Sequence, residues 1–158
     1  MKIEFTPIGT IHSPHLQPEG TPIQPRFAAG AEGTAELFPQ YLAGLRDLAG
    51  FERIWLLYWF DRACPAQLEV VPFRDNKPHG VFATRAPSRP NPLGMSCVRL
   101  LSVEGCRLRV AELDVLDATP LLDIKPYLPD CDGFEVARTG WWANAGATTA
   151  ADTRFSRK

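Results

Sequence analysis

The stretch MSCVRLLSVEGCRLRVAELDVL, residues 95–116, predicts two adjacent antiparallel strands joined by a tight turn. The turn is expected near Glu104 and Gly105. Polar and apolar side chains alternate along the second strand, most clearly at Arg107, Arg109 and their neighbours. Because alternation with a period of two is typical of strands, this stretch favours a β-rich fold.

Shorter segments on both sides of the hairpin strengthen this interpretation. ERIWLLYWF, residues 52–60, is too apolar for a half-exposed strand and predicts a strand buried on both faces. PQYLAGLRDLAG, residues 39–50, has leucines at helical spacing and predicts one short helix. Four further strands are predicted, over residues 2–11, 33–38, 68–73 and 80–85, and one last short element over residues 121–128. Many short strands with one clear helix indicate a mainly β domain, either a barrel or a sandwich.

Length and composition place the chain among ordinary soluble domains. It has 158 residues, 45% hydrophobic and 22% charged, which fits a single domain with a real core. The sequence has no apolar run of signal-peptide or membrane-spanning length, so we expect a cytoplasmic protein without a membrane partner. The four cysteines form no CxxC pair and are predicted to be buried, reduced thiols. No ligand cluster suggests a metal site.

Charge is nearly balanced overall but unevenly distributed. The net charge of −1 argues against bulk electrostatic binding to nucleic acid. Residues 71–109 nevertheless hold seven Lys and Arg against two acids, whereas residues 110–135 hold seven acids against one lysine. This pattern has two interpretations. One is a pair of complementary strands or a solvated face, and the other is a basic surface for a phosphate-bearing substrate beside an acidic pocket for a cationic one. No GxGxxG, P-loop or GxSxG motif supports a common nucleotide site or a hydrolase.

The segment APSRPNP, residues 86–92, combines stiffness with polar groups. Each proline restricts its own backbone and the residue before it, so the side chains are held in fixed directions. Arg89 offers a planar fork for phosphate or carboxylate, and Asn91 offers a donor and an acceptor. The segment is therefore either a substrate-holding corner or a structural loop whose arginines pair with the acidic segment.

A second group of polar residues follows within LDVLDATPLLDIKPYLPDCD, residues 113–132. Asp114, Asp117 and Asp123 could hold an ammonium group or a ribose, or could accept a proton. In the alternative interpretation, Asp117 caps a turn and Asp123 pairs with Lys125. Spacing alone does not separate these readings.

The motifs GVFATRAPSRPNPLGMS, residues 80–96, and LDVLDATPLLDIKPYLP, residues 113–129, together resemble the TrmO-like (TsaA-like) family of S-adenosylmethionine-dependent tRNA methyltransferases. Two upstream pieces are also similar, PIGTIHSPHLQPEGTPIQP at residues 7–25 and LAGFERIWLLYWFDRA at residues 48–63. GWW and ADTRF near the end resemble the short family members. The likeness runs in order from residue 7 to about residue 130.

The resemblance implies a function and an architecture. Family members methylate the exocyclic nitrogen of threonylcarbamoyl-adenosine next to the anticodon, with a single β-barrel core and a tendency to form homodimers. For this chain it implies a barrel domain over residues 1–140 and a C-terminal tail over residues 141–158. The alternative is an S-adenosylmethionine-binding barrel that acts on another substrate or serves as a regulatory binding module.

The resemblance also implies site residues. Asn91 and Asp117 are the implied catalytic residues, with Asp117 or water accepting the proton. Arg89 and Lys125 are implied to bind the substrate. The implied cofactor contacts are Pro25, Arg26, Phe27, Asp61, Arg62, Arg85, Met95, Ala111, Glu112, Leu113 and Asp114.

Three departures from the family pattern have consequences. Asp61 stands where the family often has histidine. Ala118 replaces glycine in the usual DGTP motif, so a positive φ there would strain the backbone. The chain resembles short members that lack an additional C-terminal domain, so tRNA recognition is expected to rely on the barrel, a dimer partner and the basic tail.

Overall fold

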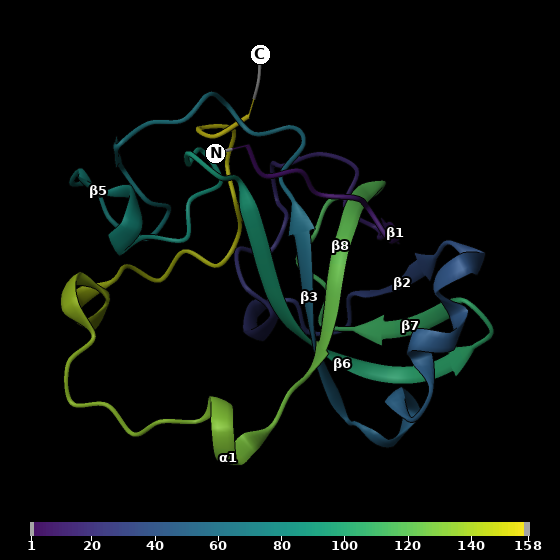
Figure 1. Ribbon diagram of the computed structural model, residues 1–158. Helices are drawn as coiled ribbons and strands as arrows, with labels where there is room; N and C mark the ends of the chain where they lie inside the picture. The colour runs from purple at the N-terminus through teal and green to yellow at the C-terminus, as the bar shows by residue number, and fades with distance from the viewer. Residues whose placement is uncertain (1, 157–158) are drawn as a thin grey trace.

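The computed structural model describes residues 2–156 and confirms a mainly β fold. Six antiparallel strands form a closed barrel in the order β1-β2-β7-β6-β3-β8 (Figure 1). The barrel strands are β1 (Gly9–His12), β2 (Glu32–Leu37), β3 (Arg53–Trp59), β6 (Leu93–Glu104), β7 (Arg107–Ala111) and β8 (Thr119–Pro126). Two short strands, β4 (Glu69–Val70) and β5 (His79–Gly80), pair with each other outside the barrel.

The β6–β7 hairpin has the predicted turn and alternation. Gly105 has a φ of 58°, a left-handed conformation that glycine adopts at little cost. Leu108 and Val110 point into the barrel and are fully buried. The alternating residues Arg107 and Arg109 face outward, where they pair with acids of the neighbouring strand β2. These two partners, Glu36 and Glu32, lie outside the acidic segment 110–135, so this pairing differs from the one that the charge pattern suggested.

Strand β3 alternates more strongly than its composition predicts. Ile54, Leu56 and Tyr58 are buried inside the barrel, whereas the residues between them are only partly covered. On that outer side, Trp55 lies 6.1 Å from Tyr127 and Trp59 lies 6.0 Å from Phe5, measured between ring centroids. The prediction of burial on both faces is wrong, because the inward side chains are buried whereas the outward ones are only partly covered.

Two other predicted elements differ from the observed ones. Residues 39–50 form two 3₁₀ segments, η2 (Pro39–Leu45) and η3 (Leu48–Gly50), instead of one continuous helix. Asp47, with a φ of 67°, lies immediately before the second segment. Residues 80–85 contain only the end of β5 and the 3₁₀ turn η4 (Val81–Ala83), so the strand predicted there is absent.

After β8 the chain turns back to the end of the barrel where β3 finishes and β6 and β8 begin. It passes through α1 (Pro129–Asp132) and η5 (Gly140–Asn144) and then lies beside residues 20–23 (Figure 1). Phe155 packs with Val70 and Val81 in a second, smaller hydrophobic cluster. The last two residues of the predicted basic tail, Arg157 and Lys158, lie outside the described residues.

Two remaining expectations concern cysteines and membrane spans. Cys64, Cys97 and Cys106 are free thiols, as predicted, but they are partly exposed, and Cys131 is exposed. The prediction of full burial is therefore wrong, although Cys106 packs against the edge of the core cluster. Within residues 2–156, no helix has the length and hydropathy needed to cross a bilayer.

Candidate functional site

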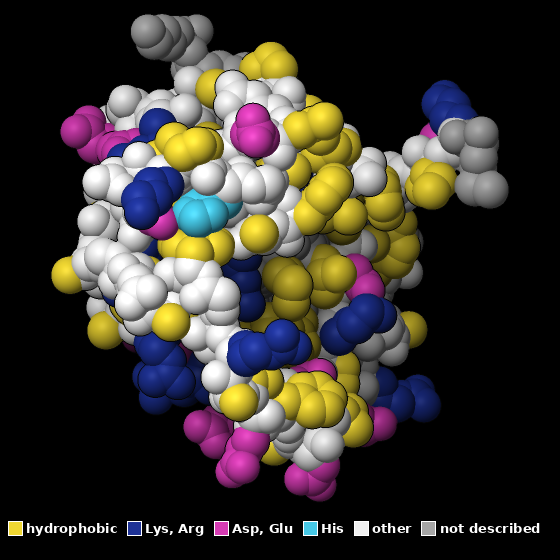
Figure 2. All heavy atoms as spheres, turned by 90° about the vertical axis from the view of Figure 1, so that its left-hand side faces the viewer, with side chains coloured by type: hydrophobic (Ala, Val, Ile, Leu, Met, Phe, Trp, Pro, Cys, Tyr) yellow, Lys and Arg dark blue, Asp and Glu magenta, His cyan; other side chains and the backbone are white. Residues whose placement is uncertain are grey.

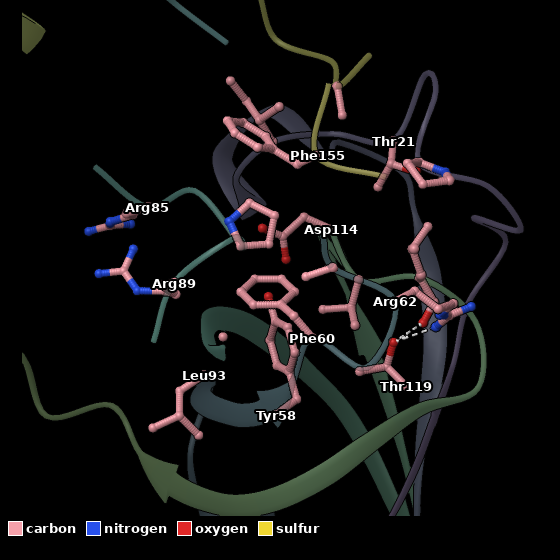
Figure 3. A pocket seen from close by; sticks show the side chains of 18 of the residues that line it. Thr21, Tyr58, Phe60, Arg62, Arg85, Arg89, Leu93, Asp114, Thr119 and Phe155 are labelled. Carbon is pink, nitrogen blue, oxygen red and sulfur yellow. Dashed lines mark hydrogen bonds between the residues drawn. The ribbon is translucent and has the colours of Figure 1, made fainter. Parts of the chain in front are cut away.

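A cavity of about 540 Å³ lies at the barrel end where β3 finishes and β6 and β8 begin (Figure 3). Its volume falls in the usual range of small-molecule sites. Most of its lining comes from five stretches of chain, residues 18–24, 58–63, 82–95, 114–119 and 151–156. Both motifs that carry the family resemblance thus meet at one cavity, although they are separated by the β6–β7 hairpin.

The proline-rich loop beside this cavity is fastened by Arg89. Nη1 of Arg89 donates hydrogen bonds to the carbonyl oxygens of Thr84 at 3.0 Å and Ala86 at 3.1 Å, with a longer one to Val81. Arg85 is exposed, and its Nη1 donates to Oε1 of Gln24 at 2.5 Å. The loop therefore has two roles. Arg89 holds the backbone of the loop in place, and side chains of the loop form part of the cavity wall.

A buried hydrogen-bond relay forms the floor of the cavity. The hydroxyls of Tyr58 and Ser96 lie 3.0 Å apart, and Ser96 Oγ donates to Oδ1 of Asp114 at 2.5 Å. Removal from water raises the pKa of Asp114 to about 7, against the opposing effects of the Ser96 hydrogen bond and the Arg85 charge. Burial also raises the pKa of Tyr58, so its hydroxyl stays protonated. Asp114 is thus a carboxyl group whose charge changes near neutral pH.

Arg62 joins the cavity to the turn before β8. Its Nη2 donates to the carbonyl oxygen of Asp117 at 2.7 Å and to Oγ1 of Thr119 at 2.9 Å (Figure 3). Between these two residues, Ala118 has a φ of 60°. This position therefore requires the conformation that glycine would adopt freely, and alanine is strained there.

Asp117 points away from the cavity. Its Oδ1 accepts a hydrogen bond from the backbone amide of Ser13 at 3.0 Å and lies 3.5 Å from Nδ1 of His12. The Ser13 amide, with a smaller contribution from His12, lowers the pKa of Asp117. The side chain is a poor base in this setting, and its contacts match the turn-capping interpretation.

A second cavity of about 740 Å³ adjoins the first and is rich in aromatic and basic side chains. The guanidinium of Arg74 lies 5.1 Å from the ring centroid of Phe27 and 4.7 Å from that of Trp142. Trp141 stacks on His79 at 4.8 Å. Figure 2 shows the side of the molecule that carries β5, where Lys and Arg side chains surround a hollow with hydrophobic walls. The two cavities share Ile23, Gln24, Phe73, Phe82, Thr84, Arg85 and Phe155.

The residues implied by the resemblance are divided among three places. The first cavity is lined by Asp61, Arg62, Arg85, Arg89, Asn91, Met95 and Asp114. The second is lined by Arg26, Phe27 and again Arg85. The lining of these two cavities does not include Pro25, Ala111, Glu112, Leu113, Asp117 or Lys125.

Several of the residues outside the cavities have structural contacts. Leu113 is fully buried in the barrel core. Glu112 pairs with Arg53 at 2.8 Å, and Lys125 pairs with Asp123 at 3.0 Å. The last pair matches the structural alternative for the acidic segment.

Several residues that line or support the first cavity belong to neither motif or carry no functional signal of their own in the sequence. Tyr58 occupies an inward position of the aromatic strand, and Ser96 is a polar residue at an inward position of β6. A polar side chain at a core position of a strand is a signal that could have identified both. Thr119 lies within the segment 113–132, and Asp152 and Phe155 reach the cavity only because the chain end returns to the barrel.

Comparison with known proteins identifies the family. Residues 10–133 match the model of the tRNA-methyltransferase O N-terminal domain. A probable S-adenosyl-L-methionine-binding protein of Pyrococcus abyssi is 50% identical over 141 residues, covering 89% of this chain and 77% of the relative. The tRNA (adenine(37)-N6)-methyltransferase of Escherichia coli is 35% identical over 158 residues, covering 94% of this chain and 67% of the enzyme.

A solved structure agrees with the sequence comparison. The crystal structure of TrmO from Pseudomonas aeruginosa superposes with a TM-score of 0.75 at 40% identity, covering 89% of this chain and 62% of that protein. This chain therefore spans about three-fifths of the length of that structure. With a family model matched over most of its length, the chain belongs to the tRNA-methyltransferase O N-terminal domain family.

Proposed function

We propose that this protein binds S-adenosylmethionine in the first cavity and transfers its methyl group to tRNA, at the exocyclic nitrogen of threonylcarbamoyl-adenosine next to the anticodon. The observation that carries the proposal is the meeting of both family motifs, residues 80–96 and 113–129, at this one cavity. The names of the relatives from P. abyssi and E. coli support the cofactor and the substrate, respectively.

The chemical character of the cavity fits this cofactor. Three carboxylates, Asp61, Asp114 and Asp152, line the cavity and suit a ligand with a sulfonium and an ammonium group. Phe82 and Met95 provide apolar surface for its adenine ring and carbon chain, with exposed fractions of 78% and 49%. When bound, the cofactor supplies a methyl group made electrophilic by the positive sulfur.

The residues of the chain then act by positioning. Asn91, exposed at the cavity edge, would hydrogen-bond the modified base. Arg85 would face the carboxylate of the cofactor, and the free nitrogens of Arg89 would face the threonine carboxylate or a phosphate. Fixing an acceptor nitrogen in line with the methyl group supplies much of the acceleration that such a displacement needs.

The second cavity supports an RNA substrate despite the net charge of −1. Its lining includes Arg26, Arg74 and Arg85 and no acidic side chain. Phe82 and Trp142 are exposed and offer faces on which unpaired bases can stack. Because the two cavities adjoin, nucleotides flanking a base held in the first cavity would fall in the second.

Two measurements test the proposal. Titration calorimetry with S-adenosylmethionine should show binding that weakens by about tenfold in Arg85→Ala, because the guanidinium is at the boundary of both cavities. Arg107 lies beside the turn of the β6–β7 hairpin and lines neither cavity, so Arg107→Ala should leave binding unchanged. Loss of affinity in both variants, or no binding by the wild type, would refute the cofactor assignment.

The substrate is tested separately. Incubation with tRNA containing threonylcarbamoyl-adenosine, followed by nucleoside mass spectrometry, should show a gain of one methyl group. No gain while the cofactor still binds would favour the alternative, a barrel that acts on another substrate or as a regulatory module. The near-neutral net charge is the observation that favours this alternative. We also propose a cytoplasmic homodimer, which a sizing column would test with untagged protein.

A further inference from the structure

We infer that Asp114, and not Asp117, takes up the proton that the acceptor nitrogen releases during methyl transfer. The inference rests on the proposed function. A nitrogen that gains a methyl group must lose its hydrogen, so a base has to lie in the cavity where the transfer takes place. The floor of the first cavity presents one carboxylate held for this purpose.

The geometry around Asp114 is that of an oriented base. Ser96 Oγ holds Oδ1 at 2.5 Å, and the buried Tyr58 hydroxyl, 3.0 Å from Ser96 Oγ, fixes the direction in which that serine donates. A carboxylate has roughly four lone-pair positions, of which Ser96 uses one. The carboxylate is therefore fixed in orientation while retaining acceptor capacity toward the cavity that it lines.

The other carboxylates near the cavity are committed to cations or amides. Asp61 pairs with Arg62 at 3.3 Å, and Asp152 pairs with Arg154 at 2.7 Å. The Arg154 hydrogen bond lowers the pKa of Asp152, and the Ser13 amide lowers that of Asp117, so both are weak bases. Burial acts in the opposite direction on Asp114, whose pKa of about 7 makes it a stronger base that is still ionised at slightly alkaline pH.

Arg85 is the charged side chain that acts on Asp114. Tyr58 and Ser96 contact it from β3 and β6 and carry no charge. The side chain of Arg85 acts on it from the proline-rich loop and partly offsets the effect of burial. The other charged side chains lining the cavity are Asp61, Arg62, Arg89 and Asp152.

The lone pair of the acceptor nitrogen forms the bond to the methyl carbon, and the carbon–sulfur bond breaks with both electrons remaining on sulfur. The N–H proton passes to a carboxylate oxygen of Asp114, which becomes neutral, while the sulfonium becomes a neutral thioether. Asp114 then returns the proton to water when the product leaves.

The test is the pH dependence of single-turnover methyl transfer with saturating cofactor and tRNA. The wild-type rate should fall at acidic pH with an apparent pKa near 7. Asp114→Asn should lower the rate at pH 8 by about 100-fold or more and abolish this acidic limb. Asp117→Asn should retain the limb, because its carboxylate lies outside the cavity. An unchanged acidic limb in Asp114→Asn would overturn the inference.

Ser96→Ala provides a second variant that keeps the carboxylate. It removes a hydrogen bond to the ionised form, so the acidic limb should move to higher pH. A purely structural role of Ser96 would lower the rate without moving the limb, and this result would count against the relay.

A readout that does not depend on turnover completes the test. Carbon NMR of protein labelled at aspartate carboxyls should show one group titrating near pH 7, absent in Asp114→Asn and shifted upward in Ser96→Ala. Absence of such a group in the wild type would overturn the inference. Full recovery of the Asp114→Asn rate at high cofactor concentration would also overturn it, since the carboxylate would then only bind the cation. Lack of methyl transfer by the wild type would instead refute the proposed function.

Discussion

The backbone of Gly94 lies directly against the ring of Tyr58. A Cβ atom at position 94 would come within 2.5 Å of Cζ of that ring, far inside van der Waals contact. The two residues face each other across the β3–β6 pair, and the ring carries the hydroxyl that contacts Ser96. The glycine of the GMS motif thus makes room for the relay beneath the cavity.

Gly94→Ala should destabilise the protein by about 2 kcal/mol, because the buried Tyr58 ring must shift into a packed core. Urea denaturation measures the change. Gly44→Ala is the matched control, since a Cβ there meets nothing within 4 Å, and its effect should stay within about 0.5 kcal/mol. Equal effects of the two substitutions would contradict the close packing.

Ala118→Gly should stabilise the protein by about 1 kcal/mol. The φ of 60° at Ala118 strains any residue with a Cβ, and relief of that strain exceeds the extra chain entropy of glycine. Thermal unfolding would show a higher Tm. A lower Tm would mean that the turn held by Arg62 tolerates alanine without strain.

Arg89→Ala and Arg85→Ala should have different effects on folding. Removing Arg89 leaves the carbonyl oxygens of Thr84 and Ala86 without this donor and should cost about 1–3 kcal/mol. Arg85 is exposed, so its removal should cost no more than about 0.5 kcal/mol. Urea denaturation of both variants makes the comparison, and similar losses would contradict a fastening role for Arg89.

Ser88→Ala should raise the free energy of unfolding by about 1 kcal/mol. The Ser88 side chain is fully buried, and its Oγ is the one buried side-chain polar atom without a hydrogen-bond partner among residues 2–156. Ser96→Ala serves as the contrast, because it removes two hydrogen bonds and should destabilise by a similar or larger amount. A loss of stability in Ser88→Ala would indicate that its hydroxyl is satisfied.

The stability of the fold should depend on pH through Asp114. Its pKa is about 7 in the folded state and near 3.8 in the unfolded chain, so the folded state binds more protons between those values. The contribution of Asp114 to stability therefore falls as pH rises from about 4 to about 7. Asp114→Asn should remove this slope in denaturation curves recorded across that range. A wild-type slope that persists in the variant would assign the dependence to another group.

The carboxyl groups with lowered pKa values affect stability at a lower pH than Asp114 does. Asp75, Asp117 and Asp152 keep their favourable contacts while ionised, and these contributions are lost as pH falls below about 4. The two effects have opposite signs and separate pH ranges, so measurements above pH 4 report mainly on Asp114.

Local patterns were sufficient for much of the barrel. The alternation around Arg107 and Arg109 predicted β7 and its hairpin. Successive side chains of a strand point to opposite faces, so a strand with one buried face shows this alternation in its local sequence. The strand predicted over residues 80–85 and the single helix over residues 39–50 were wrong. There, apolar residues pack into tertiary clusters through 3₁₀ turns, which leave no regular period in the sequence.

By itself, the sequence determined the β-rich class, the family and the two motifs that form the cavity. Only the tertiary structure separated Asp114 from Asp117, which stand three positions apart in the same motif. One is removed from water beside Ser96 and the other is held outside by a backbone amide. Desolvation and hydrogen bonding set the pKa of a carboxyl group, and here both come from residues distant in the chain.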